Sequence, residues 1–370
     1  MDISKLLDPN LFGLFLQYLQ FDEWMRLRKC PDIKRYMENH KWCLSNIMIC
    51  SQKSTEDHGF DLIKKGYNKC LTLSVFFIKE AIAIDGLENL INLGSLKIIG
   101  CYSINIPNLK NLINLKKLDL RGNEIKKATA IEGLENLTSL KELDLLNNNI
   151  KAIEVDGLEK LKNLEKLDLS YNKIEAIATI EVDGLENLKN LKELYLGSNK
   201  IKAIEGLKNL KNLEELDLSD NYIEKIEGLE NLINLKKLNL SWNKIEKIEG
   251  LENLKNLEKL DLGGNKIKTI EIEGLENLKN LTYLDLSNNR IEKIEGLENL
   301  KNLIKLILRN NEIEKIEGLE NLINLTYLDL SYNEKIKRTP YNFNMKKLKE
   351  CYVIGNNIDF IVGNTKFITR

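Results

Sequence analysis

The sequence predicts an α/β solenoid: a curved rod of stacked coils with short parallel strands on its concave face and 3₁₀ or short helical segments on its convex face. Ten leucines occupy one frame of the motif L-x-x-L-x-L-x-x-N, at spacings of 22 to 27 residues. Inside the motif, x-L-x-L-x alternates with period two, as expected for a strand with one buried face. Between motifs, leucines spaced by three, such as Leu251, Leu254 and Leu257, fit a 3₁₀ or short helical segment.

The basic repeat is 22 residues long, and the longer repeats carry insertions between the motif's Asn and the next Gly, away from the strand. Degenerate repeats at residues 93–101 and 348–356 extend the ten clear ones to twelve, and Leu71 and Leu73 indicate a weaker thirteenth. The ten frame leucines are Leu118, Leu143, Leu167, Leu194, Leu216, Leu238, Leu260, Leu284, Leu306 and Leu328.

The Asn that ends each motif lies where the chain leaves the strand. Its amide has donors and an acceptor for backbone groups that would otherwise be buried without a partner. Residues such as Asn221 and Asn289 therefore predict an asparagine ladder, with Cys101 in the same place in an early repeat. Glycines such as Gly228 and Gly250 permit the bend that follows.

This motif resembles the leucine-rich repeat over residues 71–357. The 22-residue length is similar to that of the regulatory subunit of protein phosphatase 1, a resemblance that implies a concave face binding a protein through aromatic and acidic residues. Tyr171, Tyr195 and Trp242 are similar in kind but do not match that family one by one. Bacterial surface proteins share the repeat length but need a secretion signal, and this sequence starts without the pattern of one.

Four regions are expected along the chain. A helical module covers residues 1–45, a connector or N-terminal cap covers 46–70, the repeats cover 71–333, and a last degenerate repeat with a C-terminal cap covers 334–370.

Residues 1–45 resemble an F-box, although the Leu-Pro opening of that family is missing. If the resemblance holds, it implies that these helices bind the Skp-type adaptor of a cullin ubiquitin ligase and that the repeats receive the substrate. The alternative is a plain helical cap on the first coil, which a solenoid needs in any case. The adaptor-binding residues would be Pro9, Leu11, Phe15, Leu16 and Leu19.

The exposed strand positions carry the candidate partner-binding residues. Aspartate is the usual central residue, and its column is interpreted as the repeat's consensus rather than as a cation site. Departures from the consensus carry Tyr, Trp and Arg, the types enriched at interface hot spots, although scattered surface aromatics are normal. The candidates are Tyr171, Tyr195, Asp220, Trp242, Tyr283, Ile307, Arg309, Tyr327 and Tyr332.

Charge argues for a protein partner with a basic or mixed surface. The net charge is −1, distributed as +2 over residues 1–75, −8 over the repeats and +5 over 334–370. An acidic rod does not suit a phosphate backbone, so no nucleic-acid partner is expected. No apolar run is long enough to span a membrane, and we expect a cytoplasmic or nuclear protein without membrane attachment.

No catalytic chemistry is expected. Residues 108–339 contain no Pro, Cys, His or Met, and no triad or metal-ligand pair is present there. The cysteines and histidines near the start follow no compact zinc spacing. We therefore predict a non-enzymatic protein without a metal or cofactor.

Overall fold

The computed structural model describes residues 46–50, 71–76, 84, 86–101, 106–127, 130–153, 158–177, 185, 187–270, 272–338, 345–357 and 367–368. The chain divides into two compact units: unit 1 comprises Met1–Glu124 and Thr129–Asp144, and unit 2 comprises Ile125–Ala128 and Leu145–Arg370. The predicted helical module over 1–45, with Pro9, Leu11, Phe15, Leu16 and Leu19, lies outside the described residues.

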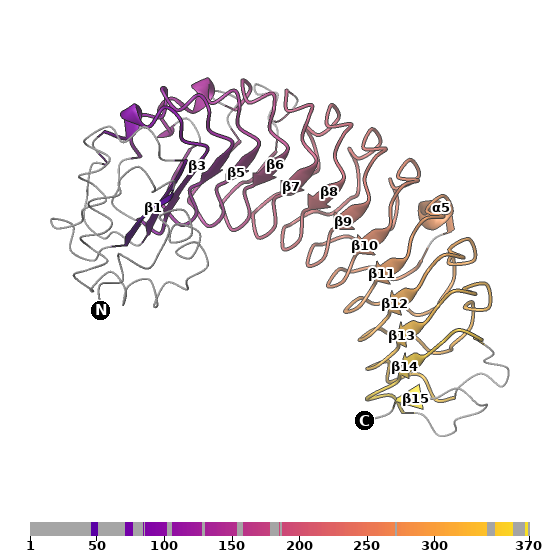
Figure 1. Ribbon diagram of the computed structural model, residues 1–370. Helices are drawn as coiled ribbons and strands as arrows, with labels where there is room; N and C mark the ends of the chain where they lie inside the picture. The colour runs from indigo at the N-terminus through magenta and orange to yellow at the C-terminus, as the bar shows by residue number, and fades with distance from the viewer. Residues whose placement is uncertain are drawn as a thin grey trace, which may run out of the picture. The chain divides into compact units, whose positions relative to one another are not determined.

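In unit 1, five strands pair in chain order, each parallel to the next (Figure 1). The first of them lies within the range predicted as connector, so the sheet begins ahead of the predicted repeats. The strands are β1 (Asn46–Cys50), β2 (Thr72–Phe76), β3 (Ser95–Ile99), β4 (Lys117–Asp119) and β5 (Glu142–Asp144).

In unit 2, ten further strands also pair in chain order and in parallel. Equivalent residues of successive coils stand opposite each other, so that Leu238 pairs with Leu260 and Leu260 with Leu284. The frame read from the sequence is the register of the sheet. The strands are β6 (Lys166–Asp168), β7 (Glu193–Tyr195), β8 (Glu215–Asp217), β9 (Lys237–Asn239), β10 (Lys259–Asp261), β11 (Tyr283–Asp285), β12 (Lys305–Ile307), β13 (Tyr327–Asp329), β14 (Glu350–Tyr352) and β15 (Phe367–Ile368).

The motif leucines form the core between the strands and the opposite turns. In the coil of β9, Leu235, Leu238 and Leu240 are at most 2% exposed. Each fully buried leucine stabilises the fold by roughly 1.5–3 kcal/mol. Stacking thus gives every coil an apolar interior that no coil has alone.

The turn side has less helix than the sequence predicts. The helices of the described chain are two 3₁₀ turns, η4 (Leu87–Asn89) and η6 (Leu134–Asn136), and one short α-helix, α5 (Ile272–Leu275). In the coil before β10, Leu254 N–H donates to Leu251 O and Leu257 N–H to Leu254 O, both at 3.0 Å. The leucine spacing of three therefore produces successive single turns. Each turn is closed by one backbone hydrogen bond between two leucines three residues apart, and the next turn starts at the second of them. None of the described helices has the length and apolar character needed to cross a bilayer.

The asparagine ladder is present. Asn243 Nδ2 donates to Leu218 O of the preceding coil at 2.9 Å and to Leu240 O of its own coil at 3.1 Å. Its Oδ1 accepts the Ile223 N–H at 3.0 Å. Cys101 fills this place with its thiol donating to Ile99 O at 3.4 Å. One side chain thus satisfies backbone groups of two coils that packing has cut off from water.

A second, exposed asparagine ladder was not predicted. In the turn before the strand, Asn234 Nδ2 donates to Lys211 O and Asn256 Nδ2 to Ile233 O, at 2.9 and 2.8 Å. Asn212 and Asn302 repeat the contact on their own preceding coils. The second Asn of the repeated sequence E-N-L-K-N-L therefore has a structural role on the turn side.

The predicted bend glycines have the expected conformation. Gly250 has φ +78°, and a Cβ there would lie 1.9 Å from Ile226 O of the preceding coil. Gly228 and Gly318 are in the same situation. Side chains are excluded because successive coils approach within backbone contact.

Candidate functional site

The exposed side of strands β6–β14, called here the strand face, offers three positions per coil. These are the first and third residues of the strand, whose side chains point away from the buried middle one, and the edge residue just before the strand. In β9 they are Lys237, Asn239 and Lys236. The residues at these positions differ between two groups of strands. We call β6–β9 the paired strands, because their lysines form ion pairs with glutamates, and β10–β14 the open strands.

On the paired strands every lysine at a first or edge position meets a glutamate of the neighbouring coil. Lys166 Nζ lies 2.8 Å from Glu193 Oε2, and Lys237 Nζ lies 2.6 Å from Glu215 Oε2. The edge residues repeat this pattern, with Lys192 paired to Glu165 and Lys236 to Glu214.

Tyr195 belongs to the same network. Its hydroxyl donates to Glu193 Oε2 at 3.0 Å, and Lys166 Nζ lies 4.7 Å from its ring centroid. Burial raises the pKa of Tyr195 well above its usual value, and Glu215 and Glu193 raise it further. The hydrogen bond from Lys166 holds the pKa of Glu193 below its usual range. The charges of the paired strands therefore satisfy each other within the fold.

On the open strands tyrosines occupy the first positions of β11 and β13. Lys305 Nζ lies 4.4 Å from the Tyr327 ring centroid and 5.6 Å from that of Tyr283, so the ammonium stands between two aromatic rings. The Tyr327 and Tyr352 rings follow at 5.3 Å. Among the described residues, no carboxylate lies within ion-pair distance of Lys259 or Lys305. Lys305 is held by π contacts with two tyrosines instead of by an ion pair.

Ile307 and Arg309 occupy the middle of the open strands. Ile307 is half-buried where its neighbours across the sheet, Asp285 and Asp329, are carboxylates. Arg309 is exposed, and its guanidinium carbon lies 4.5 Å from the ring centroid of Tyr332 on the next coil.

Tyr171, Trp242 and Tyr332 share one unusual position, directly before the ladder asparagine. Their φ values are 55°, 55° and 58°, a left-handed conformation that costs a bulky residue roughly 1 kcal/mol. Trp242 is 62% exposed and its ring covers Gly264 of the next coil, within 2.8 Å of where a Cβ would stand. Tyr332 covers Gly355 in the same way. A next-coil glycine thus makes room for these two rings.

Asp220 occupies this left-handed position with φ 52° and accepts the Ser198 hydroxyl at 2.9 Å. The aspartates at the third strand position have a structural task as well. Asp217 and Asp285 each accept the backbone N–H two residues on, at 2.8 Å. Their contact supports the interpretation of this column as repeat consensus, because it closes the turn after the strand.

Asp261 is the aspartate whose environment differs most. Burial raises its pKa to about 6, the Gly263 N–H opposes this shift, and Asp285 and Asp217 add to it. In the part of the chain that is described, no group of three or more His, Cys, Asp or Glu residues forms a metal site.

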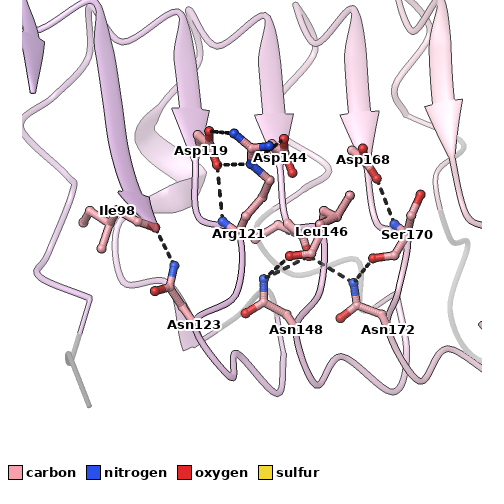
Figure 2. Close-up of polar contacts among 11 residues, drawn as sticks. Ile98, Asp119, Arg121, Asn123, Asp144, Leu146, Asn148, Asp168, Ser170 and Asn172 are labelled. Carbon is pink, nitrogen blue, oxygen red and sulfur yellow. Dashed lines mark hydrogen bonds and ion pairs between the residues drawn. The ribbon is translucent and has the colours of Figure 1, made fainter. Parts of the chain in front are cut away.

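In unit 1 an arginine stands at the position of Arg309 with a different environment (Figure 2). Arg121 Nε and Nη2 donate to Asp119 at 2.9 and 2.7 Å, and Nε lies 3.3 Å from Asp144 Oδ2. Asp119 is only 9% exposed. This arginine is therefore fully engaged by the residues around its own strand.

The structure brings Tyr283, Ile307, Arg309, Tyr327 and Tyr332 together on the open strands. Tyr195 lies in the ion-pair network, whereas Tyr171 and Trp242 follow β6 and β9 as separate exposed rings. The sequence motifs did not single out Lys305, Tyr352 or the paired residues Lys166, Glu193, Glu215 and Lys237. Comparison of equivalent positions in adjacent repeats would have found them.

Comparison with protein families agrees with this architecture. A model described as a leucine-rich repeat region matches residues 92–267, and a model of two leucine-rich repeats matches 255–299 and 301–344. The chain is a leucine-rich repeat protein. No curated protein sequence matches it significantly.

Solved structures similar to this leucine-rich repeat protein include three from bacteria. An internalin of Listeria monocytogenes is 27% identical, with a TM-score of 0.63 over 85% of this chain and 92% of its own. A leucine-rich repeat protein of Leptospira interrogans is 24% identical, with a TM-score of 0.68 over 88% of this chain and 93% of its own. The functional domain of a second Listeria monocytogenes protein, described as having a cysteine ladder, is 22% identical, with a TM-score of 0.62 over 80% of this chain and 63% of its own. The last two show the fold alone.

Proposed function

We propose that this leucine-rich repeat protein is a non-enzymatic scaffold that binds a protein partner on the strand face of unit 2. The observation that carries the proposal is the arrangement of Lys305 between Tyr283 and Tyr327. These half-buried rings stand on the outer side of the sheet, where the leucine core does not need them. Tyrosine and arginine in such rigid surroundings are typical of interface hot spots.

The rest of the strand face supports this location. Trp242 and Tyr332 are exposed aromatic side chains that the backbone accommodates at a strained φ. The fold needs neither ring at this position, since Asn288 and Asn310 occupy it with the same φ. A binding role supplies a reason for side chains that packing does not require.

Affinity capture with quantitative mass spectrometry tests the proposal. The full chain is compared with the double variant Tyr283→Ser/Tyr327→Ser and with a control, Lys255→Ser/Lys279→Ser, on the turn side. We expect the partner's binding to fall at least about tenfold in the tyrosine variant and to be unchanged in the control. If both variants, folded by circular dichroism, retain the same proteins as the wild type, the strand face is not the binding surface.

A second function rests on the F-box-like pattern of residues 1–45. In this version the chain is a substrate receptor of a cullin ubiquitin ligase, and the strand face holds the substrate. Recovery of a Skp-type adaptor, abolished by Leu16→Asp or Leu19→Asp, supports it. A folded protein that never retains the adaptor excludes it.

A phosphatase regulatory role is a third version, based on repeat length and on Tyr171, Tyr195 and Trp242. It requires the catalytic subunit of a phosphatase among the captured proteins. All three versions place the protein in the cytoplasm or nucleus, which fractionation of the source cells would test.

A further inference from the structure

Within the described residues, Lys305 and Arg309 on the open strands lack the acidic partners that cations of the same fold have elsewhere. Lys166, Lys237 and Arg121 each lie within 3.3 Å of a carboxylate oxygen of a neighbouring residue. Among the described residues, Arg309 and Lys305 contact no carboxylate. Charged side chains are therefore available on this part of the strand face for a ligand of opposite sign.

The difference between Arg121 and Arg309 originates at the third residue of the strand. Arg121 is held by Asp119, the third residue of its own strand. The equivalent residue before Arg309 is Ile307, which offers no acceptor. Arg309 instead lies over the Tyr332 ring at 4.5 Å. The edge of its planar guanidinium carries the N–H donors, and no acceptor among the described residues binds them.

The carboxylates near Arg309 are already engaged. Asp329 is buried and accepts the Ser331 N–H at 2.9 Å. Asp285 accepts the Ser287 N–H at 2.8 Å and the Tyr283 hydroxyl at 3.3 Å. Glu350 accepts the Tyr352 hydroxyl at 3.1 Å. These hydrogen bonds reduce the competition that the protein's own carboxylates offer to an incoming one.

An apolar surface adjoins the free guanidinium. Ile307 stands half-buried in the middle of the sheet, and Tyr327 lies diagonally across from it on the neighbouring strand, where it pairs with Lys305. Ile304, at the edge of β12, is 46% exposed. A ligand that satisfies this surface carries an anionic group and an aliphatic or aromatic side chain close to each other.

We propose that the open strands bind a peptide segment of a protein partner in which an Asp or Glu stands next to an apolar residue. The carboxylate of that segment binds the Arg309 guanidinium, and its apolar side chain packs on Ile307 and Tyr327. This inference rests on the proposed function and names the chemistry of the partner.

Selection from a phage-displayed library of random linear peptides tests the inference with the full chain. We expect enriched peptides to carry Asp or Glu beside an aliphatic or aromatic residue. Enrichment of basic peptides, or no enrichment over the uncoated surface, overturns the inference.

Variants then assign the selected peptides to Arg309. Arg309→Ser introduces the residue that Ser287 and Ser331 provide at this position, and Ile307→Asp introduces an acceptor for Arg309 like that of Asp119. We expect both to weaken a selected, fluorescently labelled peptide about tenfold or more, and Ile307→Asn, which adds no charge, to weaken it less. Arg121→Ser serves as the control and should bind as the wild type does. Unchanged binding in Arg309→Ser or Ile307→Asp overturns the inference.

The proposed function can fail separately. If the Tyr283→Ser/Tyr327→Ser variant keeps its captured proteins, the strand face binds nothing and both proposals fall. If that variant no longer captures a partner while Ile307→Asp retains it, the scaffold function stands and the acidic ligand is wrong.

Discussion

Arg121 and Arg309 follow the strand at the same place in their coils, yet one belongs to the fold and the other to the surface. The Arg121 side chain donates to Asp119 from Nε and Nη2, and Nε lies 3.3 Å from Asp144 Oδ2. Arg309 has Ile307 in place of that aspartate and stacks on Tyr332. A single substitution in the repeat, at the third strand residue, decides whether the arginine is neutralised locally.

The same contrast divides the strand face of unit 2. Lysines of β6–β9 pair with glutamates, whereas Lys305 on β12 lies between tyrosines. Ion pairs between exposed groups contribute little to stability. They do neutralise the lysine charges, which are then not available to bind an anionic ligand. The difference therefore bears on binding more than on folding.

The largest expected effect concerns Trp242, which follows the last paired strand and would extend the binding surface beyond the open strands. Trp242→Asn should weaken the captured partner by about 2 kcal/mol in a titration. Asparagine suits the site because Asn288 and Asn310 have the same φ, so relief of the left-handed strain compensates for the missing packing of the ring on Gly264. Tyr171→Asn, at the same position of the β6 coil, tests whether the binding surface reaches that coil as well. Equal affinity of the Trp242 variant and the wild type would confine binding to the open strands.

Asp119→Ile would convert the Arg121 coil into one like that of Arg309. The nearly buried Asp119 accepts three hydrogen bonds from Arg121, and hydrogen bonds to charged groups are worth roughly 1.5–3 kcal/mol. Because Asp144 still lies near Arg121, we expect the free energy of unfolding in urea to fall by about 1–2 kcal/mol. The free energy of unfolding should fall by less in Asp119→Asn, since the asparagine keeps a hydrogen-bond acceptor for Arg121. A variant as stable as the wild type would show that this ion pair adds nothing to the fold.

Asp261 predicts a pH dependence of stability on the open strands. Its folded pKa of about 6 lies above the ordinary 3.8, so the charged form is disfavoured by folding. The penalty is fully present above about pH 6 and disappears as the pH falls below about 4. Asp261→Asn should therefore raise stability near neutral pH by about 1 kcal/mol and leave it unchanged near pH 4.

Thermal melting across this range measures the effect. Asn239 shows that asparagine can accept the same backbone N–H, from Ser241 at 3.1 Å. Asp217→Asn is the control, because its neighbours across the sheet are Tyr195 and Asn239 rather than a carboxylate. A gain of equal size at both pH values would mean that the buried charge of Asp261 is not the cause.

The smallest effects compare one lysine from each group of strands. Lys237→Met removes an exposed ion pair, worth about 0.5 kcal/mol or less, and high salt should abolish the difference. Lys305→Met removes cation–π interactions with two tyrosines, worth about 0.5–1 kcal/mol, and should be less sensitive to salt. Unfolding in urea at low and high salt measures both. Equal salt dependence in the two variants would show that lysines of the paired and of the open strands contribute to stability in the same way.

Much of the fold follows from the repeat period. Because each coil contacts its neighbours at equivalent residues, a spacing of 22 residues already states that Leu216 pairs with Leu238 and that Asn243 reaches the coil of Leu218. The turn side was less predictable. The spacing of Leu251, Leu254 and Leu257 gives single turns there, where the sequence predicts a 3₁₀ or short helical segment.

The candidate residues were located with less detail. An unusual residue in a regular repeat is visible in the sequence, and Tyr283, Ile307, Arg309 and Tyr327 do come together. Lys305 does not stand out in the sequence because lysine is ordinary at its position, and it matters through the tyrosines on either side.

The sequence by itself determined the coil, the register and the buried ladder, because these depend on residues repeated at a fixed interval. The tertiary structure decided which charges are neutralised and which are available. Asp329 lies on the coil next to Arg309, as Asp144 does for Arg121, but Arg309 stacks on Tyr332 instead. That choice depends on side-chain conformations across two coils and on a tyrosine held at φ 58°, which no spacing in the sequence specifies.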